Sequence, residues 1–190
     1  MSVDRKQQII EAATKSFSLF GYKATTMDQV AKLANVGKGT IYTFFKNKEE
    51  LFDEIVQSLI NEMRYKAEDV IDPNNSFHEN VHRALFQILQ YRKQHQLTIK
   101  LFQEGKEMGT PAVLDVMKKI EEELLSFIKE KVTLAIQSGQ IKPCNPEVAA
   151  FIVLKLYVSL IFDWEQHKEP LSESEISSLF ELYLLKGLSV

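Results

Sequence analysis

Cysteine is nearly absent from this sequence, because Cys144 is the only one among 190 residues. A single cysteine cannot form a disulfide within the chain, which is typical of proteins that work in a reducing compartment. The first residues also lack the apolar core of a secretory signal peptide. We therefore expect a cytoplasmic protein that is not built on disulfides.

Long hydrophobic runs are missing as well. The longest apolar stretch covers about residues 148–162, is interrupted by Lys155 and is too short to span a bilayer. No segment alternates apolar and polar residues as a half-buried strand does, and there is no internal repeat or low-complexity tract. The sequence therefore predicts a globular, all-α protein with no membrane partner.

Apolar residues instead recur at the spacing of an α-helix, as in the stripe formed by Ile10, Ala13, Phe17 and Phe20. Capping pairs mark four helix starts: Thr26 with Gln29, Asn47 with Glu50, Ser76 with Glu79, and Ser172 with Glu175. Two more helices start with proline at the first helical position, at Thr110–Pro111 and Asn145–Pro146. Nine helices are expected, and the first eight end near Phe20, Ala34, Phe45, Ile71, Lys93, Glu104, Ser138 and His167.

Net charge is small, at −3, but it is unevenly distributed along the chain. Residues 1–48 carry eight basic and three acidic side chains and are therefore +5, whereas the remaining residues are −8. A basic segment can neutralise phosphates, and an acidic remainder repels them. This asymmetry predicts that the N-terminal end alone would bind a nucleic acid.

Two short helices joined by a tight turn are expected in the basic segment, at about residues 26–34 and 38–45. This arrangement is typical of a DNA-binding helix-turn-helix, in which the second helix enters the major groove. We expect Ile41, Phe44 and Phe45 to pack inward. The side chains left for the groove are Lys38, Thr40, Tyr42 and Thr43. Lysine and tyrosine suit phosphate contacts, and threonine can touch base edges.

Three further residues fit the same role. Gly39 has no side chain, so the backbone there can approach DNA closely, and Lys46 and Lys48 can extend the phosphate contacts. The run TTMDQVAKLANVGKGTIYTFFKNKEEL at residues 25–51, preceded by Gly21-Tyr22, resembles the signature of the tetracycline-repressor (TetR) family. The resemblance covers residues 5–55. Beyond them the chain resembles the family only in the number and length of its helices.

The change of charge predicts a head at residues 1–46 and a body at residues 47–190. The resemblance implies that the head binds DNA and that the body binds a ligand and forms the dimer. It also implies a homodimeric repressor that binds a palindromic operator and is released by a ligand. By the family pattern, the DNA contacts fall on Thr26, Lys38, Gly39, Thr40, Tyr42, Thr43 and Lys48. The sequence departs from the pattern at Gly37, where the family often has a serine cap, and at Thr43-Phe44, so no operator sequence can be carried over.

The last two helices are expected to form the dimer interface. The eighth helix is apolar on more than one side, and such a helix needs two partners. One partner is its own core, and the other would be the same helices of a second chain. The expected interface residues are Val153, Leu156, Leu160, Trp164, Ile176, Leu179, Phe180 and Tyr183. The alternative is that these helices are simply buried within one monomer.

Aromatic and methionine side chains are frequent in the fifth to eighth helices. Such side chains more often form a core, but they also line apolar pockets. The candidate pocket residues are Phe86, Phe102, Met117, Phe127 and Tyr157. If a small effector binds there, we expect it to be lipophilic, and we expect no cofactor.

A competing motif is His78-Glu79-Asn80-Val81-His82, which matches the H-E-x-x-H pattern of zinc proteases. Two histidines at this spacing can bind one Zn²⁺ while the glutamate acts as a base. Against this, Glu79 already has a capping role with Ser76, Arg83 follows the motif, and no strand is expected beside the helix. We therefore expect neither an enzyme nor a catalytic metal, and keep a regulatory site at His78 and His82 as a weak alternative.

Two other functions remain as alternatives to the DNA-binding regulator. A zinc hydrolase would bind about one Zn²⁺ per chain and would lose activity when Glu79 is replaced by glutamine. A helical interaction protein without a DNA role would bind DNA weakly and without regard to sequence. The regulator predicts partners of three kinds: an operator duplex, a second copy of the chain and a small lipophilic effector.

Overall fold

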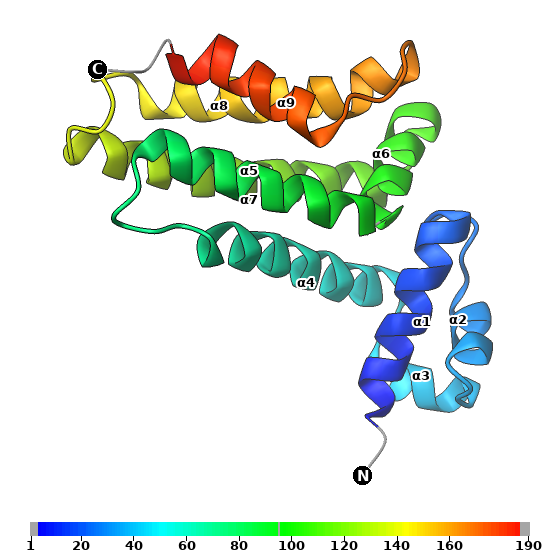
Figure 1. The fold of residues 1–190 in the computed structure, drawn as a ribbon. Coiled ribbons are helices and arrows are strands. Elements are labelled where there is room, and N and C mark those ends of the chain that lie inside the picture. Colours follow the sequence, from blue (N-terminus) through cyan, green and yellow to red (C-terminus); the bar gives the residue numbers. More distant parts are fainter. Residues whose placement is uncertain (1–3, 95, 187–190) are drawn as a thin grey trace. The chain divides into compact units, whose positions relative to one another are not determined.

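The computed structural model describes residues 4–94 and 96–186, and these residues form nine α-helices and no strand (Figure 1). The helices are α1 Arg5–Phe20, α2 Met27–Leu33, α3 Lys38–Phe44, α4 Lys48–Asp69, α5 Phe77–Gln94, α6 Gln96–Met108, α7 Pro111–Gln137, α8 Pro146–Val158 and α9 Glu173–Phe180. The all-α class and the helix number predicted from the sequence are confirmed. None of the helices in this part of the chain combines the length and apolar character needed to cross a membrane.

The capping signals position the helices as predicted. At α2 the Thr26 hydroxyl accepts the Gln29 N–H, and the Gln29 side chain accepts the Thr26 N–H. At the start of α4 the Glu50 N–H donates to Asn47 Oδ1 over 2.8 Å. The paired groups satisfy backbone donors that a helix start leaves without a partner inside the helix. Helix starts could therefore be predicted from neighbouring residues alone.

Two helix ends differ from the expected ones. The sixth helix was expected to stop near Glu104, but α6 continues to Met108 with Gly105 inside it. A Cβ on Gly105 would lie 2.4 Å from Met117 Sδ, so the missing side chain lets α7 pack closely against α6 rather than ending the helix. The eighth α-helix ends at Val158, before the expected end near His167, but the chain stays helical as a π turn, Ser159–Asp163, and a short 3₁₀ turn, Trp164–Gln166.

Packing divides the chain into two compact units. One unit contains Met1–Asn61 and Arg92–Ile120, and the other contains Glu62–Tyr91 and Glu121–Val190. The helices α4 and α7 therefore each contribute residues to both units. In the first unit, α2 and α3 pack beside α1 (Figure 1).

The core of the first unit is centred on aromatic side chains from α1, the α1–α2 turn and α4. Phe17 is fully buried, with its ring centroid 5.2 Å from Phe52 and 5.8 Å from Tyr22. Phe20, which was expected on the same stripe, is 59% exposed, so this expectation was wrong. Because α1 ends at Phe20 and the chain turns at Gly21, Tyr22 fills the core position instead.

The second unit contains two apolar clusters within its described residues. One joins Leu85 of α5 to α8, α9 and the turns that follow them, and includes Ile161, Ile176, Phe180 and Leu184. The other joins α7 to the start of α8 through Val132, Ala135, Ile141 and Ala149, with Cys144 packed partly buried against it. In this unit α9 lies beside α8 (Figure 1).

The contrast between Phe17 and Phe20 gives a direct test of the first core. Replacing Phe17 by alanine removes a fully buried ring and is expected to lower the free energy of unfolding by about 3–5 kcal/mol. Phe20→Ala in the same helix removes an exposed ring and is expected to change it by about 0.5 kcal/mol or less. Urea unfolding at one protein concentration measures both, and similar losses would mean that the α1 faces are wrongly placed.

Candidate nucleic-acid interface

The second helix of the candidate helix-turn-helix is fixed from one side only. Ile41 and Phe45 are buried in the core of the first unit, whereas Phe44, which was expected to pack inward, is exposed. The α2–α3 turn contains Asn35 at φ 53°, and the Val36 N–H donates to the Ala31 carbonyl over 3.0 Å. The helix is therefore held through two apolar anchors, and its other residues face away from the core.

The predicted DNA-contacting residues lie mostly on the surface. The exposed ones are Thr26, Lys38, Gly39, Tyr42, Thr43 and Lys46. The Thr43 hydroxyl donates to the Gly39 carbonyl over 3.0 Å, as is common for threonine within a helix. Thr40 and Lys48 are half-buried. The start of α3 at Gly37 has no side-chain cap, as the missing serine at this position predicted.

An ion pair connects the starts of α2 and α3. Lys38 Nζ donates to Asp28 Oδ2 over 2.9 Å, and this hydrogen bond raises the pKa of Lys38 above its ordinary value. Both side chains are more than half exposed, so the pair contributes little to stability. Lys38 therefore stays charged in the pH range of a cell, with a partner that a phosphate would have to displace.

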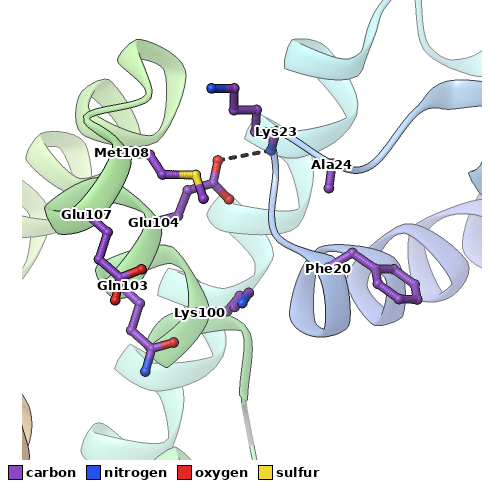
Figure 2. Close-up of a pocket in the computed structure, with 8 residues that line it drawn as sticks. All are labelled: Phe20, Lys23, Ala24, Lys100, Gln103, Glu104, Glu107 and Met108. Carbon is purple, nitrogen blue, oxygen red and sulfur yellow. Dashed lines mark hydrogen bonds between the residues drawn. The ribbon is translucent and has the colours of Figure 1, made fainter.

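The turn between α1 and α2 is held by a carboxylate from α6. Glu104 is only 5% exposed, and its two oxygens accept the backbone N–H groups of Tyr22 and Lys23 over 2.6 and 2.9 Å. The Thr110 hydroxyl adds a third hydrogen bond of 3.1 Å. Figure 2 shows Glu104 pointing from α6 to the backbone of this turn. A buried charge is tolerated when it is hydrogen-bonded in this way.

Gly21 makes this arrangement possible. Its φ is 83°, and a Cβ on it would lie 2.4 Å from Glu104 Oε2. Only glycine adopts such a backbone conformation without strain. The Gly21-Tyr22 pair predicted the turn from the sequence, but the role of Glu104 was missed. An acidic residue in an expected helix carries no local sign that it will be buried.

The opposite side of the turn is held from the start of α4. Lys48 Nζ donates to the carbonyl oxygens of Tyr22 and Thr25 over 2.9 and 3.0 Å and lies 4.1 Å from the Tyr22 ring centroid. The Tyr22 hydroxyl donates to Glu49 Oε1 over 2.8 Å, which lowers the pKa of Glu49. Burial of the ring raises the pKa of Tyr22. Lys48, predicted to contact DNA, is thus occupied by the protein's own backbone.

A pocket of about 160 Å³ lies beside the same turn (Figure 2). It is lined by Phe20, Lys23, Ala24, Lys100, Gln103, Glu104, Glu107 and Met108. None of the five candidate effector-pocket residues lines it. This pocket was not predicted from the sequence, because its walls come from a turn and a helix about 80 residues apart in the chain.

The five candidate effector-pocket residues have different surroundings. In the first unit, Met117 packs partly buried against the core, and Phe102 is half-buried. In the second unit, Phe86 is exposed, and the Tyr157 ring lies 6.4 Å from that of Phe180. The Phe127 ring lies near two cations, 5.1 Å from the Arg64 guanidinium and 5.0 Å from Lys131 Nζ.

The candidate dimer residues also separate into groups. Ile176 and Phe180 are buried in the protomer's own core, and Val153, Leu156, Leu160 and Leu179 are half-buried. Trp164 is exposed, and Tyr183 is 71% exposed. Four further exposed apolar residues of the same region lie outside the expected interface set: Val148, Phe151, Ile152 and Leu182. Val148, Phe151 and Ile152 lie on α8, whose apolar character on several sides indicates them, whereas Leu182 lies after α9.

The H-E-x-x-H motif acts as a helix start. The Ser76 N–H and hydroxyl both donate to the Glu79 carboxylate, over 2.8 and 2.9 Å, and lower its pKa. The capping role predicted for this pair is therefore confirmed. His82 is exposed, and the His78 side chain lies outside the described part of the structure. Among the described residues, no three His, Cys, Asp or Glu side chains are grouped as metal ligands.

Comparison with known proteins identifies relatives of the whole chain. Residues 9–55 match the family model described as bacterial regulatory proteins, tetR family. The HTH-type transcriptional regulator YhgD of Bacillus subtilis (strain 168) is 65% identical over 189 residues, which cover 100% of this chain and 99% of the relative.

Solved structures share the fold. The structure of the SmeT–triclosan complex has a TM-score of 0.82 and 16% identity, and covers 98% of this chain and 92% of that chain. The transcriptional regulator FadR from Bacillus subtilis in complex with stearoyl-CoA has a TM-score of 0.75 and 21% identity, and covers 91% and 96%.

The close approach at Gly21 gives a second test. Gly21→Ala places a methyl group against Glu104 at a positive φ, and it is expected to lower the free energy of unfolding by about 1–3 kcal/mol. Gly139→Ala is the matched control, since Gly139 has φ 71° but open space around its Cβ position. Chemical unfolding of both variants should show the larger loss for Gly21. Equal losses would show that Glu104 does not restrict the turn.

Proposed function

Because the chain belongs to the TetR family of DNA-binding transcriptional regulators, we propose that it is a homodimeric repressor that binds a palindromic operator and leaves it when a small effector binds. Residues 1–46 read the DNA, and residues 47–190 carry the effector site and the dimer interface. A regulator of this kind works where the DNA is, so we place it in the cytoplasm. The observation that carries the proposal is the exposed face of α3.

This face presents side chains suited to contacts with DNA phosphates and side chains suited to contacts with base edges. Lys38 and Lys46 bring positive charge to the phosphates, and Tyr42 can add a phosphate contact from its exposed position. Thr40 and Thr43 present methyl and hydroxyl groups to base edges. Gly39 has no neighbour within 4 Å of its Cβ position, which leaves the backbone of α3 open to close approach. The anchors Ile41 and Phe45 hold the face in place.

Asp28 is expected to reduce the affinity for DNA in general. Its carboxylate lies 2.9 Å from Lys38 Nζ and would lie near the phosphates that Lys38 approaches. Binding would require the ammonium to exchange a carboxylate for a phosphate. Contacts to the correct bases would then have to offset this exchange, which favours the operator over other sequences.

The dimer is supported by the exposed apolar residues on α8 and after α9. Phe151, Ile152, Leu182 and Tyr183 expose large apolar side chains, which are frequent at protein–protein interaction sites. A second copy related by a two-fold axis would cover them with the same residues. Two reading helices held about 34–36 Å apart then match successive major grooves, which is why the operator is expected to be a palindrome.

The effector is proposed to be lipophilic. The structural relatives in complex with triclosan and stearoyl-CoA bind ligands with large apolar parts. The candidate contacts in this chain, Phe86, Phe102, Met117, Phe127 and Tyr157, are aromatic or flexible and apolar. For release of DNA, such a ligand must bind the DNA-free form more tightly than the DNA-bound form.

Selection from random duplex DNA with the full-length protein tests the proposed function. Enrichment of a palindrome is the expected result. Tyr42→Ala should then weaken operator binding about tenfold or more, because one recognition contact contributes about 1–3 kcal/mol. Tyr65→Ala, which removes an exposed tyrosine from α4, is the matched control and should leave the affinity unchanged. Normal operator binding by the Tyr42 variant would show that α3 does not face the DNA.

Gly39→Ala separates DNA contact from folding. Alanine is more favourable than glycine inside an exposed helix by about 0.5–1 kcal/mol, so the variant should be as stable as the parent protein or more stable. Its methyl group should still lower operator affinity if the α3 backbone approaches the DNA closely. Thermal unfolding and operator titration measure the two quantities. Unchanged affinity in a stable variant would place DNA away from Gly39.

A further inference from the structure

The ammonium group of Lys48 is bound by backbone carbonyls of the protein itself. Lys48 is the first residue of α4, yet its half-buried side chain reaches into the α1–α2 turn. Its ammonium donates to the carbonyl oxygens of Tyr22 and Thr25 over 2.9 and 3.0 Å. The Tyr22 ring, 4.1 Å away, faces the same charge. An ammonium has three N–H donors, and these neighbours use most of its binding capacity.

The two residues that this contact joins flank the reading helices. Residues 26–47 contain α2 and α3 and begin directly after Thr25, whereas Lys48 directly follows them. The hydrogen bond between the Lys48 ammonium and the Thr25 carbonyl therefore joins the two ends of this segment. Lys46, by contrast, has an exposed side chain two residues away.

The partner of Lys48 is itself firmly placed. Thr25 is fully buried, and its hydroxyl donates to the Gly21 carbonyl over 2.8 Å and is hydrogen-bonded to Ser16 over 3.0 Å. The next residue, Thr26, caps α2. A bond to the Thr25 carbonyl therefore fixes the point from which α2 starts, and α3 packs against α2.

We propose that Lys48 is a positioning residue, which closes the segment carrying α2 and α3 and does not neutralise a DNA phosphate. The proposal rests on operator binding by α3. A phosphate would have to compete for the ammonium with two carbonyl hydrogen bonds and the Tyr22 ring. Lys48 then affects the affinity for the operator because it places α3. It does not change the number of phosphates that the protein neutralises.

Salt dependence distinguishes the two roles. Each neutralised phosphate contributes about 0.9 to the slope of log affinity against log salt concentration. Lys48→Met in the full-length protein is expected to weaken binding to the selected operator about tenfold with little change in this slope, and to leave the affinity for unrelated duplex DNA unchanged. Lys46→Met, the matched control, is expected to lower the slope by about 0.9 and to weaken binding to both kinds of DNA.

A charge-conserving variant gives the second arm. Arginine can bind a phosphate at least as well as lysine, but we expect that its larger planar group cannot reproduce the contacts of the compact ammonium with two carbonyls and a ring. Lys48→Arg should therefore also lose operator affinity. Full affinity in Lys48→Arg together with a reduced slope in Lys48→Met would overturn the proposal and assign a phosphate contact.

Hydrogen exchange of the DNA-free protein keeps the proposal testable without an operator. Lys48→Met should speed the exchange of the α2 amides, and Lys46→Met should not. Unchanged α2 exchange in Lys48→Met would show that the contact does not hold the segment. If selection recovers no operator, the proposed function fails, and the exchange result still decides the role of Lys48.

Discussion

The placement of α2 and α3 depends on the hydrogen bonds that one buried carboxylate accepts from the α1–α2 turn. Glu104 receives two backbone N–H groups of the α1–α2 turn and the Thr110 hydroxyl, and these bonds compensate for removing its charge from water. The α1–α2 turn also places Tyr22 against Phe17 and Phe52, and α2 begins directly after it. The position of the reading helices is therefore decided partly by a residue of α6, far from them in sequence.

Local signals predicted most of the fold. The starts of α2, α4, α5 and α9 followed from capping residues, because a cap satisfies donors only three residues away. Features that depend on distant packing were missed. Phe20 shares the period of the buried α1 residues but lies at the helix end. The sixth helix was expected to end near Glu104, yet it continues through Gly105, which marks close contact with Met117.

The candidate site was predictable to a similar extent. The motif located α3, and its apolar spacing identified Ile41 and Phe45 as anchors, whereas Phe44 is exposed. Residue type could not show that the Lys48 ammonium is bound to two carbonyls, because this depends on a turn 23 residues earlier in the chain. Periodicity also could not distinguish residues that line a pocket from residues of the core, because both recur at the same helical spacing. Phe127 has this spacing, and in the structure its ring lies near two cations.

Glu104 and Lys48, which bind the α1–α2 turn, lie outside residues 1–46, and this limits where the DNA-binding segment can be cut and joined to another protein. A reading head cut at residue 46 would lack both Glu104 and Lys48, which together hold the N–H and carbonyl groups of its first turn. Grafted onto an unrelated body, it would carry a turn with unmatched polar groups. The transferable module is instead discontinuous, with Arg92–Ile120 accompanying Met1–Asn61. Recombination between relatives should preserve the pairing of positions 21 and 104 rather than any single breakpoint.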